Sequence, residues 1–176
     1  NACNASPSAD AIHGLLLNDA VVTIASGNGT REMPLHEFFK GPGKTALETG
    51  EMVLKFFVPA PKAHTGASYQ KYAIRGDSDI SIVGAGARLT LAEDGTVAEA
   101  RITLASVAPT PLRMFEAEKM LVGSKLDAEA IEKAAELCST QVSPITDQRA
   151  TREYRIEMVR VWVRHALEQA LERAEA

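Results

Sequence analysis

Residues 79–107 have the sequence DISIVGAGARLTLAEDGTVAEARITLASV, and this stretch decides the fold. Its two halves are rich in apolar and β-branched residues, and the stretch EDGT at 93–96 between them is typical of a hairpin turn. Gly84 and Gly86 interrupt the first half, where glycine marks a β-bulge or a close approach of another part of the chain. We therefore predict two long antiparallel strands, within 79–92 and over 97–107.

The segments around this hairpin complete the pattern. A further strand is predicted over 68–74, and helices are predicted over 112–121, 127–140 and 150–176. The last helix has the clearest periodicity, because one of its faces is entirely apolar: Val159, Trp162, Val163, Ala166 and Leu167. We expect that face to pack on the sheet. Strands followed by helices predict an α+β fold, with a three-stranded antiparallel sheet packed against a three-helix bundle.

Residues 1–62 contain a smaller, β-rich set of elements. Ser6-Pro7-Ser8 precedes an apolar run and predicts a short helix that ends near Asn18, with proline at its first position. The other expected features are strands over 20–25, 30–34 and 51–58, a helical turn or loop over 35–39, and a break at 41–43. Pro59 and Pro61 favour an extended connector, so we place a boundary between a first domain at 1–62 and a second domain at 66–176.

The composition predicts a soluble globular protein. The chain has 176 residues, of which 45% are hydrophobic and 24% are charged. These values exclude a disordered tail, a collagen-like repeat and a membrane protein. The formal net charge of −4 and the aromatic content of 5% argue against a nucleic-acid partner, and the charge also argues against a membrane surface. We expect neither a membrane span nor a signal peptide.

The two cysteines predict no particular chemistry. Cys3 and Cys138 are far apart in sequence, and neither has a second ligand at zinc spacing. We expect two free thiols in a reducing cytoplasm. The chain opens on Asn1-Ala2 with no methionine, and this dipeptide is also a common remnant of tag cleavage. We expect the chain to be a fragment of a longer protein.

Several familiar motifs are incomplete. The stretch GPGKT at 41–45 lacks the first glycine of a phosphate-binding loop, because Phe38 stands at that position. The stretch GAG at 84–86 lacks the third glycine of a dinucleotide-binding fingerprint and lies inside a predicted strand. The four histidines share no ligand spacing and no Gly-x-Ser-x-Gly sequence is present, so we expect no metal site and no hydrolytic centre.

Two segments are candidates for a binding site. Residues 4–10 place small side chains and backbone N–H groups at the start of a helix, where an anion is stabilised. The alternative is that this segment only caps the helix, with Asp10 complementing the helix dipole. On physical grounds alone we favour the cap.

The second candidate segment covers residues 69–80. Tyr69, Lys71 and Ala73 would share one face of a strand, where Lys71 would present a cation to a phosphate or to a polarised carbonyl. Arg75 and Asp79 would form an ion pair across a tight loop. A solvated face of an edge strand explains the same residues equally well.

Together these segments resemble the flavin subunit of the molybdenum hydroxylases, which include the carbon monoxide dehydrogenase medium subunit and the FAD domain of xanthine dehydrogenase. The family pattern Gly-Gly-Asn-x-x-Asn/Thr-Ala-Ser-Pro-x-x-Asp survives in residues 1–10. The next family features follow in order: Pro-Leu-x-x-Phe-Phe at 34–39, Gly-Pro-Gly-Lys-Thr at 41–45, Gly-Glu-x-Val/Leu-Leu at 50–54, and Tyr-x-Lys-x-x-x-Arg-x-x-x-Asp-Ile at 69–80. The ordered set is specific, although no single motif is.

The resemblance implies an FAD-binding subunit of an oxidoreductase with three components. Electrons would pass from a molybdopterin centre through two 2Fe–2S clusters, all on partner subunits, to the flavin and then to an acceptor. For the flavin, the resemblance implies that Asn4 lies near the pyrophosphate, Asp10 near the ribityl or flavin side, and that Lys71 contacts the cofactor. It also implies that Met52 and Val53 pack against the flavin.

Under this resemblance, the first domain is the C-terminal part of an FAD-binding domain and the second is the flavoprotein C-terminal domain. A different function is also open, in which the second domain is a non-catalytic docking module for the iron–sulfur and molybdopterin subunits. Without any family assumption, the chain is a small α+β binding domain.

Overall fold

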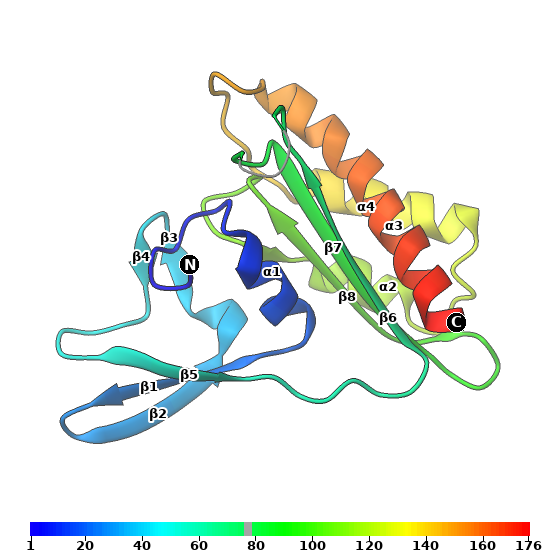
Figure 1. Ribbon diagram of the computed structural model, residues 1–176. Coiled ribbons are helices and arrows are strands. Elements are labelled where there is room, and N and C mark those ends of the chain that lie inside the picture. Colours follow the sequence, from blue (N-terminus) through cyan, green and yellow to red (C-terminus); the bar gives the residue numbers. More distant parts are fainter. Residues whose placement is uncertain (76–78) are drawn as a thin grey trace.

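The structure is a computed structural model that describes residues 1–75 and 79–176. A first group of strands and one helix precede a second sheet and three further helices (Figure 1). The helices are α1 (Asp10–Leu17), α2 (Phe115–Leu121), α3 (Ala128–Thr140) and α4 (Arg152–Glu175), with a 3-10 turn, η1 (Leu35–Glu37). The strands are β1 (Val21–Ser26), β2 (Gly29–Pro34), β3 (Phe39–Gly41), β4 (Lys44–Thr45), β5 (Met52–Phe57), β6 (Thr65–Tyr72), β7 (Val83–Leu91), β8 (Val97–Ala105) and β9 (Leu112–Arg113).

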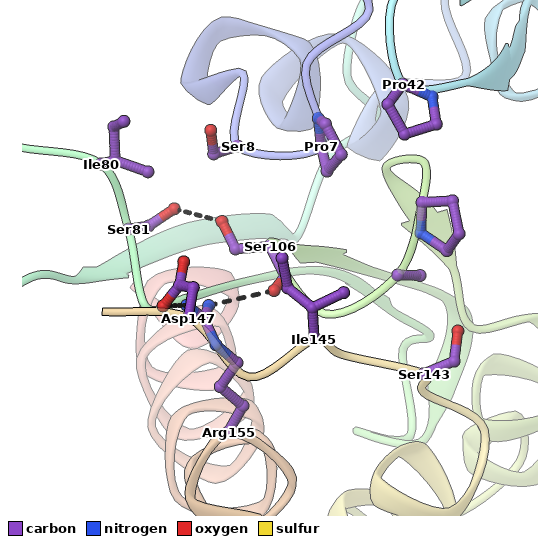
Figure 2. A pocket seen from close by; sticks show the side chains of 12 residues that line it. Pro7, Ser8, Pro42, Ile80, Ser81, Ser106, Ser143, Ile145, Asp147 and Arg155 are labelled. Carbon is purple, nitrogen blue, oxygen red and sulfur yellow. Dashed lines mark hydrogen bonds and ion pairs between the residues drawn. The ribbon is translucent and has the colours of Figure 1, made fainter. Parts of the chain in front are cut away.

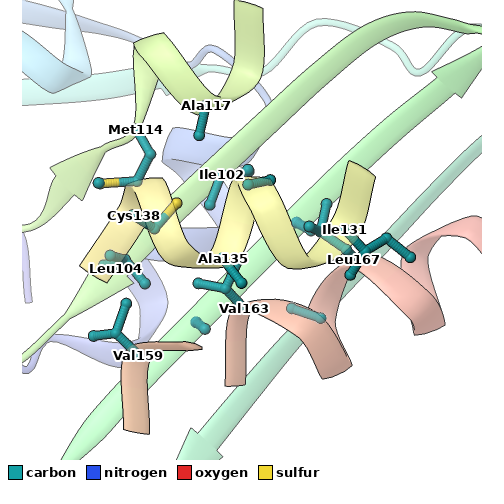
Figure 3. Packing of buried hydrophobic residues seen from close by; sticks show 14 of the residues in the cluster. Ile102, Leu104, Met114, Ala117, Ile131, Ala135, Cys138, Val159, Val163 and Leu167 are labelled. Atoms are coloured by element: carbon teal, nitrogen blue, oxygen red, sulfur yellow. The ribbon is translucent and has the colours of Figure 1, made fainter. Parts of the chain in front are cut away.

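The predicted hairpin forms the centre of an antiparallel sheet with the order β6-β7-β8-β9. Side chains alternate between the two faces of this sheet. Ala85, Ala87 and Leu89 of β7 belong to the larger hydrophobic core, which α2, α3 and α4 cover (Figure 3). The α+β fold class is therefore confirmed, and a short fourth strand, β9, extends the predicted three-stranded sheet.

Helix α4 covers the sheet with the apolar face that its periodicity predicts. Thr151 caps its first turn by accepting a hydrogen bond from the Tyr154 N–H at 3.2 Å. Four of the five predicted face residues are buried: Val159, Val163, Ala166 and Leu167. The fifth, Trp162, is only partly buried, because it lies beside the edge strand β6 and stacks on Tyr72 with ring centroids 5.3 Å apart.

The opposite face of the sheet receives α1. Gly86 lets the helix approach closely, since a Cβ at that position would lie 2.9 Å from the Leu17 side chain. Of the two alternatives predicted for the glycines of β7, the close approach is therefore present. The irregularity in the pairing of β7 with β8 lies elsewhere, between Thr90 and Leu91. Just after α1, Asp19 forms ion pairs with Arg88, Arg101 and Arg113, which lie on three different strands.

Residues before the connector form a second, smaller core. Strands β2, β1 and β5 pair in that order, and β3 and β4 form a separate two-stranded hairpin. Ile12 and Leu16 of α1 pack in this core with Val22, Ile24 and Phe38. Because His13 and Leu17 instead face the larger sheet, α1 contacts both parts of the chain.

Two predicted helix boundaries are wrong. The first helix begins at Asp10 and not at Pro7, because the Ala9 N–H donates to the Ser6 carbonyl in a turn at 3.1 Å, and no side chain caps the helix. The predicted helix 112–121 begins only at Phe115. Its first residues instead form β9, because Leu112 and Arg113 pair with Leu104 and Thr103 of β8.

Within residues 1–75 and 79–176, no helix is both long and apolar enough to cross a membrane.

Candidate functional site

The two charged residues that the resemblance assigns to the cofactor lie side by side. Lys71 Nζ on β6 donates a hydrogen bond to Asp10 Oδ2 in the first turn of α1, at 2.7 Å. The two residues are 61 positions apart in sequence, and they meet because α1 packs on the face of the sheet to which Lys71 points. The ammonium of Lys71 carries three N–H donors, and within the described part of the chain Asp10 is the only acceptor that it contacts, so two donors there are open to an anionic or carbonyl ligand.

The aromatic rings of Tyr69 and His13 lie on one side of this ion pair. The Tyr69 hydroxyl donates to Asp10 Oδ1 at 3.3 Å, and its ring stacks on that of His13 with centroids 5.3 Å apart and an interplanar angle of 9°. Burial lowers the pKa of His13 to about 4, so the imidazole is neutral at pH 7. Burial, together with the Asp10 carboxylate, raises the pKa of Tyr69, which therefore keeps its proton.

The segment before α1 is anchored to both halves of the molecule. Ala5, which is fully buried with a φ of 45°, accepts a hydrogen bond from the Gly43 N–H at 3.2 Å. Pro7 accepts one from the Ser106 N–H at 2.9 Å. Asn4 lies exposed within this segment, and among the described residues no hydrogen bond of its side chain is present. The predicted side-chain cap is absent, so the anchoring comes from backbone contacts.

The two apolar candidates lie on another sheet. Met52 and Val53 open β5, which pairs with β1. Val53 packs on the smaller core that also buries Ala5 and Ala9, whereas the Met52 side chain is 63% exposed. Among the described residues, no hydrogen bond or ion pair joins this part of β5 to Asp10 or Lys71.

A pocket of about 250 Å³ lies where the anchored segment meets the larger sheet (Figure 2). Pro7, Ser8 and Pro42 form one wall, and Ile80 and Ile145 form parts of the others. Its floor holds a hydrogen bond of 2.7 Å between the hydroxyls of Ser81 and Ser106, and an ion pair of 2.8 Å between Arg155 and Asp147.

The charges of this pocket are mutually compensated. Burial raises the pKa of Asp147, but hydrogen bonds from the backbone N–H of Arg149 and from Arg155 outweigh it and lower the pKa to about 2. The buried Arg155 also donates to the carbonyls of Ile82 and Ser106. These contacts tie the start of β7, the end of β8 and α4 together at the base of the pocket.

The predicted ion pair at the end of β6 is present. Arg75 Nη2 donates to Asp79 Oδ1 at 3.1 Å, and this bond lowers the pKa of Asp79 to about 2. The loop that joins the two residues, 76–78, lies outside the described residues. Strand β6 is indeed an edge strand, and Lys71 nevertheless points to α1 rather than only to solvent.

Two features of this region are not predictable from the sequence: the pocket, and the stacking of His13 on Tyr69. The residues of the pocket come from six separate stretches of the chain, so no local sequence motif predicts them. In the sequence, His13 is one of four histidines without ligand spacing, and nothing local indicates that it stacks on Tyr69. The alternation of Tyr69 and Lys71 along one strand was the signal that placed both on one face.

The chain matches two family models. Residues 67–170 match the CO dehydrogenase flavoprotein C-terminal domain, and residues 1–61 match the FAD binding domain in molybdopterin dehydrogenase. The chain is 34% identical over 172 residues to the xanthine dehydrogenase FAD-binding subunit of Escherichia coli O157:H7, covering 97% of this chain and 59% of that protein. It is also 34% identical over 174 residues to the carbon monoxide dehydrogenase medium chain of Afipia carboxidovorans, covering 99% and 60%.

Solved structures agree with these matches. A crystal structure of the Cu,Mo-CO dehydrogenase superposes with a TM-score of 0.92 at 33% identity, over 98% of this chain and 59% of that chain. Quinoline 2-oxidoreductase from Pseudomonas putida 86 superposes with a TM-score of 0.89 at 27% identity, over 99% and 60%. The chain therefore spans about three fifths of the length of these relatives.

Proposed function

This chain belongs to the family of the CO dehydrogenase flavoprotein C-terminal domain, and from that premise we propose that it is part of an FAD-binding subunit of a molybdenum hydroxylase. The observation that carries the proposal is the ion pair between Asp10 and Lys71. Its two members come from the two regions that match the two family models. A cofactor bound between the two regions would contact both members of this pair, which supports the proposal.

The residues that the resemblance assigns to the cofactor suit the separate parts of a flavin dinucleotide. Counting only contacts with residues 1–75 and 79–176, Lys71 has donors left for a phosphate or carbonyl oxygen. The backbone of residues 4–10 is held in place at Ala5 and Pro7. Asn4 is exposed in this segment, so its side chain is accessible to the pyrophosphate of the proposed cofactor. The exposed Met52 and the adjacent Val53 offer an apolar surface on which an aromatic ring system can pack.

A bound flavin accepts electrons and passes them on one or two at a time. In the proposed assembly, these electrons come from 2Fe–2S clusters and a molybdopterin centre on partner subunits and go on to an acceptor. This chain's own residues bind and orient the cofactor: Lys71 supplies positive charge, and Asp10 holds the lysine in place. Cys3 and Cys138 are both free thiols, which supports a cytoplasmic location.

We also propose that the boundary between an FAD-binding region and a C-terminal domain lies in the connector at 59–64. Docking to partner subunits is a second candidate role for the C-terminal domain. The surface around α2 supports it, because Phe115 at the start of the helix and Val122 just after its end are 50% and 52% exposed.

Lys71 and Asp10 should both contribute to the affinity for FAD. Replacing Lys71 with alanine in the complete flavoprotein should weaken FAD binding by about tenfold to a hundredfold, because a charge-assisted hydrogen bond is lost. Asp10→Ala should have a similar effect. The measurement is a titration of the flavin-free protein with FAD, followed by the quenching of flavin fluorescence.

Lys62→Ala is the matched control. Lys62 also forms an ion pair, with Glu99, but on a part of the surface away from Asp10 and Lys71. Its loss should leave the FAD affinity unchanged. Equal effects of all three substitutions would contradict the assignment of Asp10 and Lys71 to the cofactor.

A further inference from the structure

Tyr69 and Lys71 hold the same carboxylate from one strand. Both side chains point from β6 to α1, and each contacts a different oxygen of Asp10, Oδ1 from Tyr69 and Oδ2 from Lys71. A carboxylate bonded at one oxygen can still rotate about its side-chain torsions, whereas bonds at both oxygens fix its plane. The direction of the Lys71 ammonium therefore depends on the hydroxyl of Tyr69.

The ring of Tyr69 is itself tightly held. The imidazole of His13, which is fully buried, stacks on one side of it. Gly84 on the neighbouring strand β7 leaves the space that the hydroxyl occupies, since a Cβ at that position would lie 2.4 Å from the hydroxyl oxygen. Few alternative positions are open to this ring, so its hydroxyl reaches Asp10 without a large loss of conformational freedom.

We propose that Tyr69 is a positioning residue for the flavin, which acts by fixing the Asp10 carboxylate and through it the Lys71 ammonium. This inference rests on the proposed function, because it assigns the ion pair to FAD. It adds a residue that does not itself contact the cofactor. The Asp10 side chain is 47% exposed, so a hydrogen bond of 3.3 Å to it contributes little to the stability of the fold. We therefore assign the Tyr69 hydroxyl a role in cofactor binding and not in stability.

The test compares two tyrosines on one strand. Tyr69→Phe in the complete flavoprotein removes the hydroxyl that reaches Asp10, and should weaken FAD binding by about fivefold without changing the urea midpoint of unfolding. Tyr72→Phe is the matched control, because the Tyr72 hydroxyl bonds that of Tyr154 at 2.8 Å on the other face of β6. It should leave FAD affinity unchanged.

A double-mutant cycle distinguishes positioning from a structural role. In a Lys71→Ala background, Tyr69→Phe should have no further effect on FAD affinity, because the ammonium that the hydroxyl positions is absent. Additive losses, or equal effects of Tyr69→Phe and Tyr72→Phe, would overturn the inference. If Lys71→Ala alone left FAD affinity unchanged, the proposed function would fail first, so the two failures can be told apart.

Discussion

Burial of His13 makes stability sensitive to mild acid. The pKa of His13 is about 4 in the folded protein because burial disfavours the imidazolium, whereas its ordinary value is 6.5. The unfolded chain therefore binds a proton that the folded protein does not bind between pH 6.5 and 4, and the free energy of unfolding falls as the pH decreases through this window. We expect a loss of roughly 3 kcal/mol, measured by urea unfolding at several pH values.

His13→Phe provides the control for this prediction. Phenylalanine can still stack on Tyr69 but does not titrate, so the pH dependence above pH 4 should flatten. The carboxyls of Asp79 and Asp147 have pKa values of about 2, and the stability that they contribute is lost only at lower pH. If the variant and the original protein lost stability equally between pH 6.5 and 4, another group would be responsible.

The contact between Asp10 and Lys71 is not predictable from the spacing of residues in the sequence. Asp10 and Lys71 are separated by 61 positions, and only the packing of α1 on the sheet brings them together. The resemblance implies that both residues contact one cofactor, and this assignment stays a prediction. Arg75 and Asp79 are only four positions apart, so their ion pair is predictable from the sequence, and it is present.

At the scale of elements, periodicity located most helices and strands to within a few residues. The exceptions have two causes, a distant pairing partner in one case and a local turn in the other. Leu112 and Arg113 precede a helical pattern, but β8 offers unpaired backbone groups to them, so they form a strand. The start of α1 shifted for a local reason, since Ser6 forms a turn to Ala9 instead of capping the helix.

Trp162 of α4 should stabilise the fold through its contact with the edge strand β6. Trp162→Ala should lower the free energy of unfolding by about 2 kcal/mol, because the indole is partly buried and stacks on Tyr72 of the edge strand. Trp162→Phe, which retains the stacking, should cost less than half as much. Urea unfolding followed by circular dichroism provides the measurement, and a free energy unchanged in the alanine variant would mean that α4 does not need this contact.

At the scale of the whole molecule, α1 connects regions that match two different family models. Ile12 and Leu16 pack in the smaller core, while His13 and Leu17 face the larger sheet. The ion pairs of Asp19 add a polar connection to three strands of that sheet. An extended connector, as the sequence predicts at 59–64, therefore does not imply that the two regions are independent of each other.

The position of the Tyr69 hydroxyl against Gly84 has an evolutionary consequence. In a relative with alanine, serine or threonine at the position of Gly84, a tyrosine at the position of Tyr69 would have to shift, because the added Cβ would lie 2.4 Å from the hydroxyl oxygen. Substitutions at these two positions should therefore be correlated, with any residue larger than glycine at 84 accompanied by one smaller than tyrosine at 69. An alignment of the family measures this correlation directly, and independent variation would show that the backbone of β7 can yield where this sequence relies on glycine.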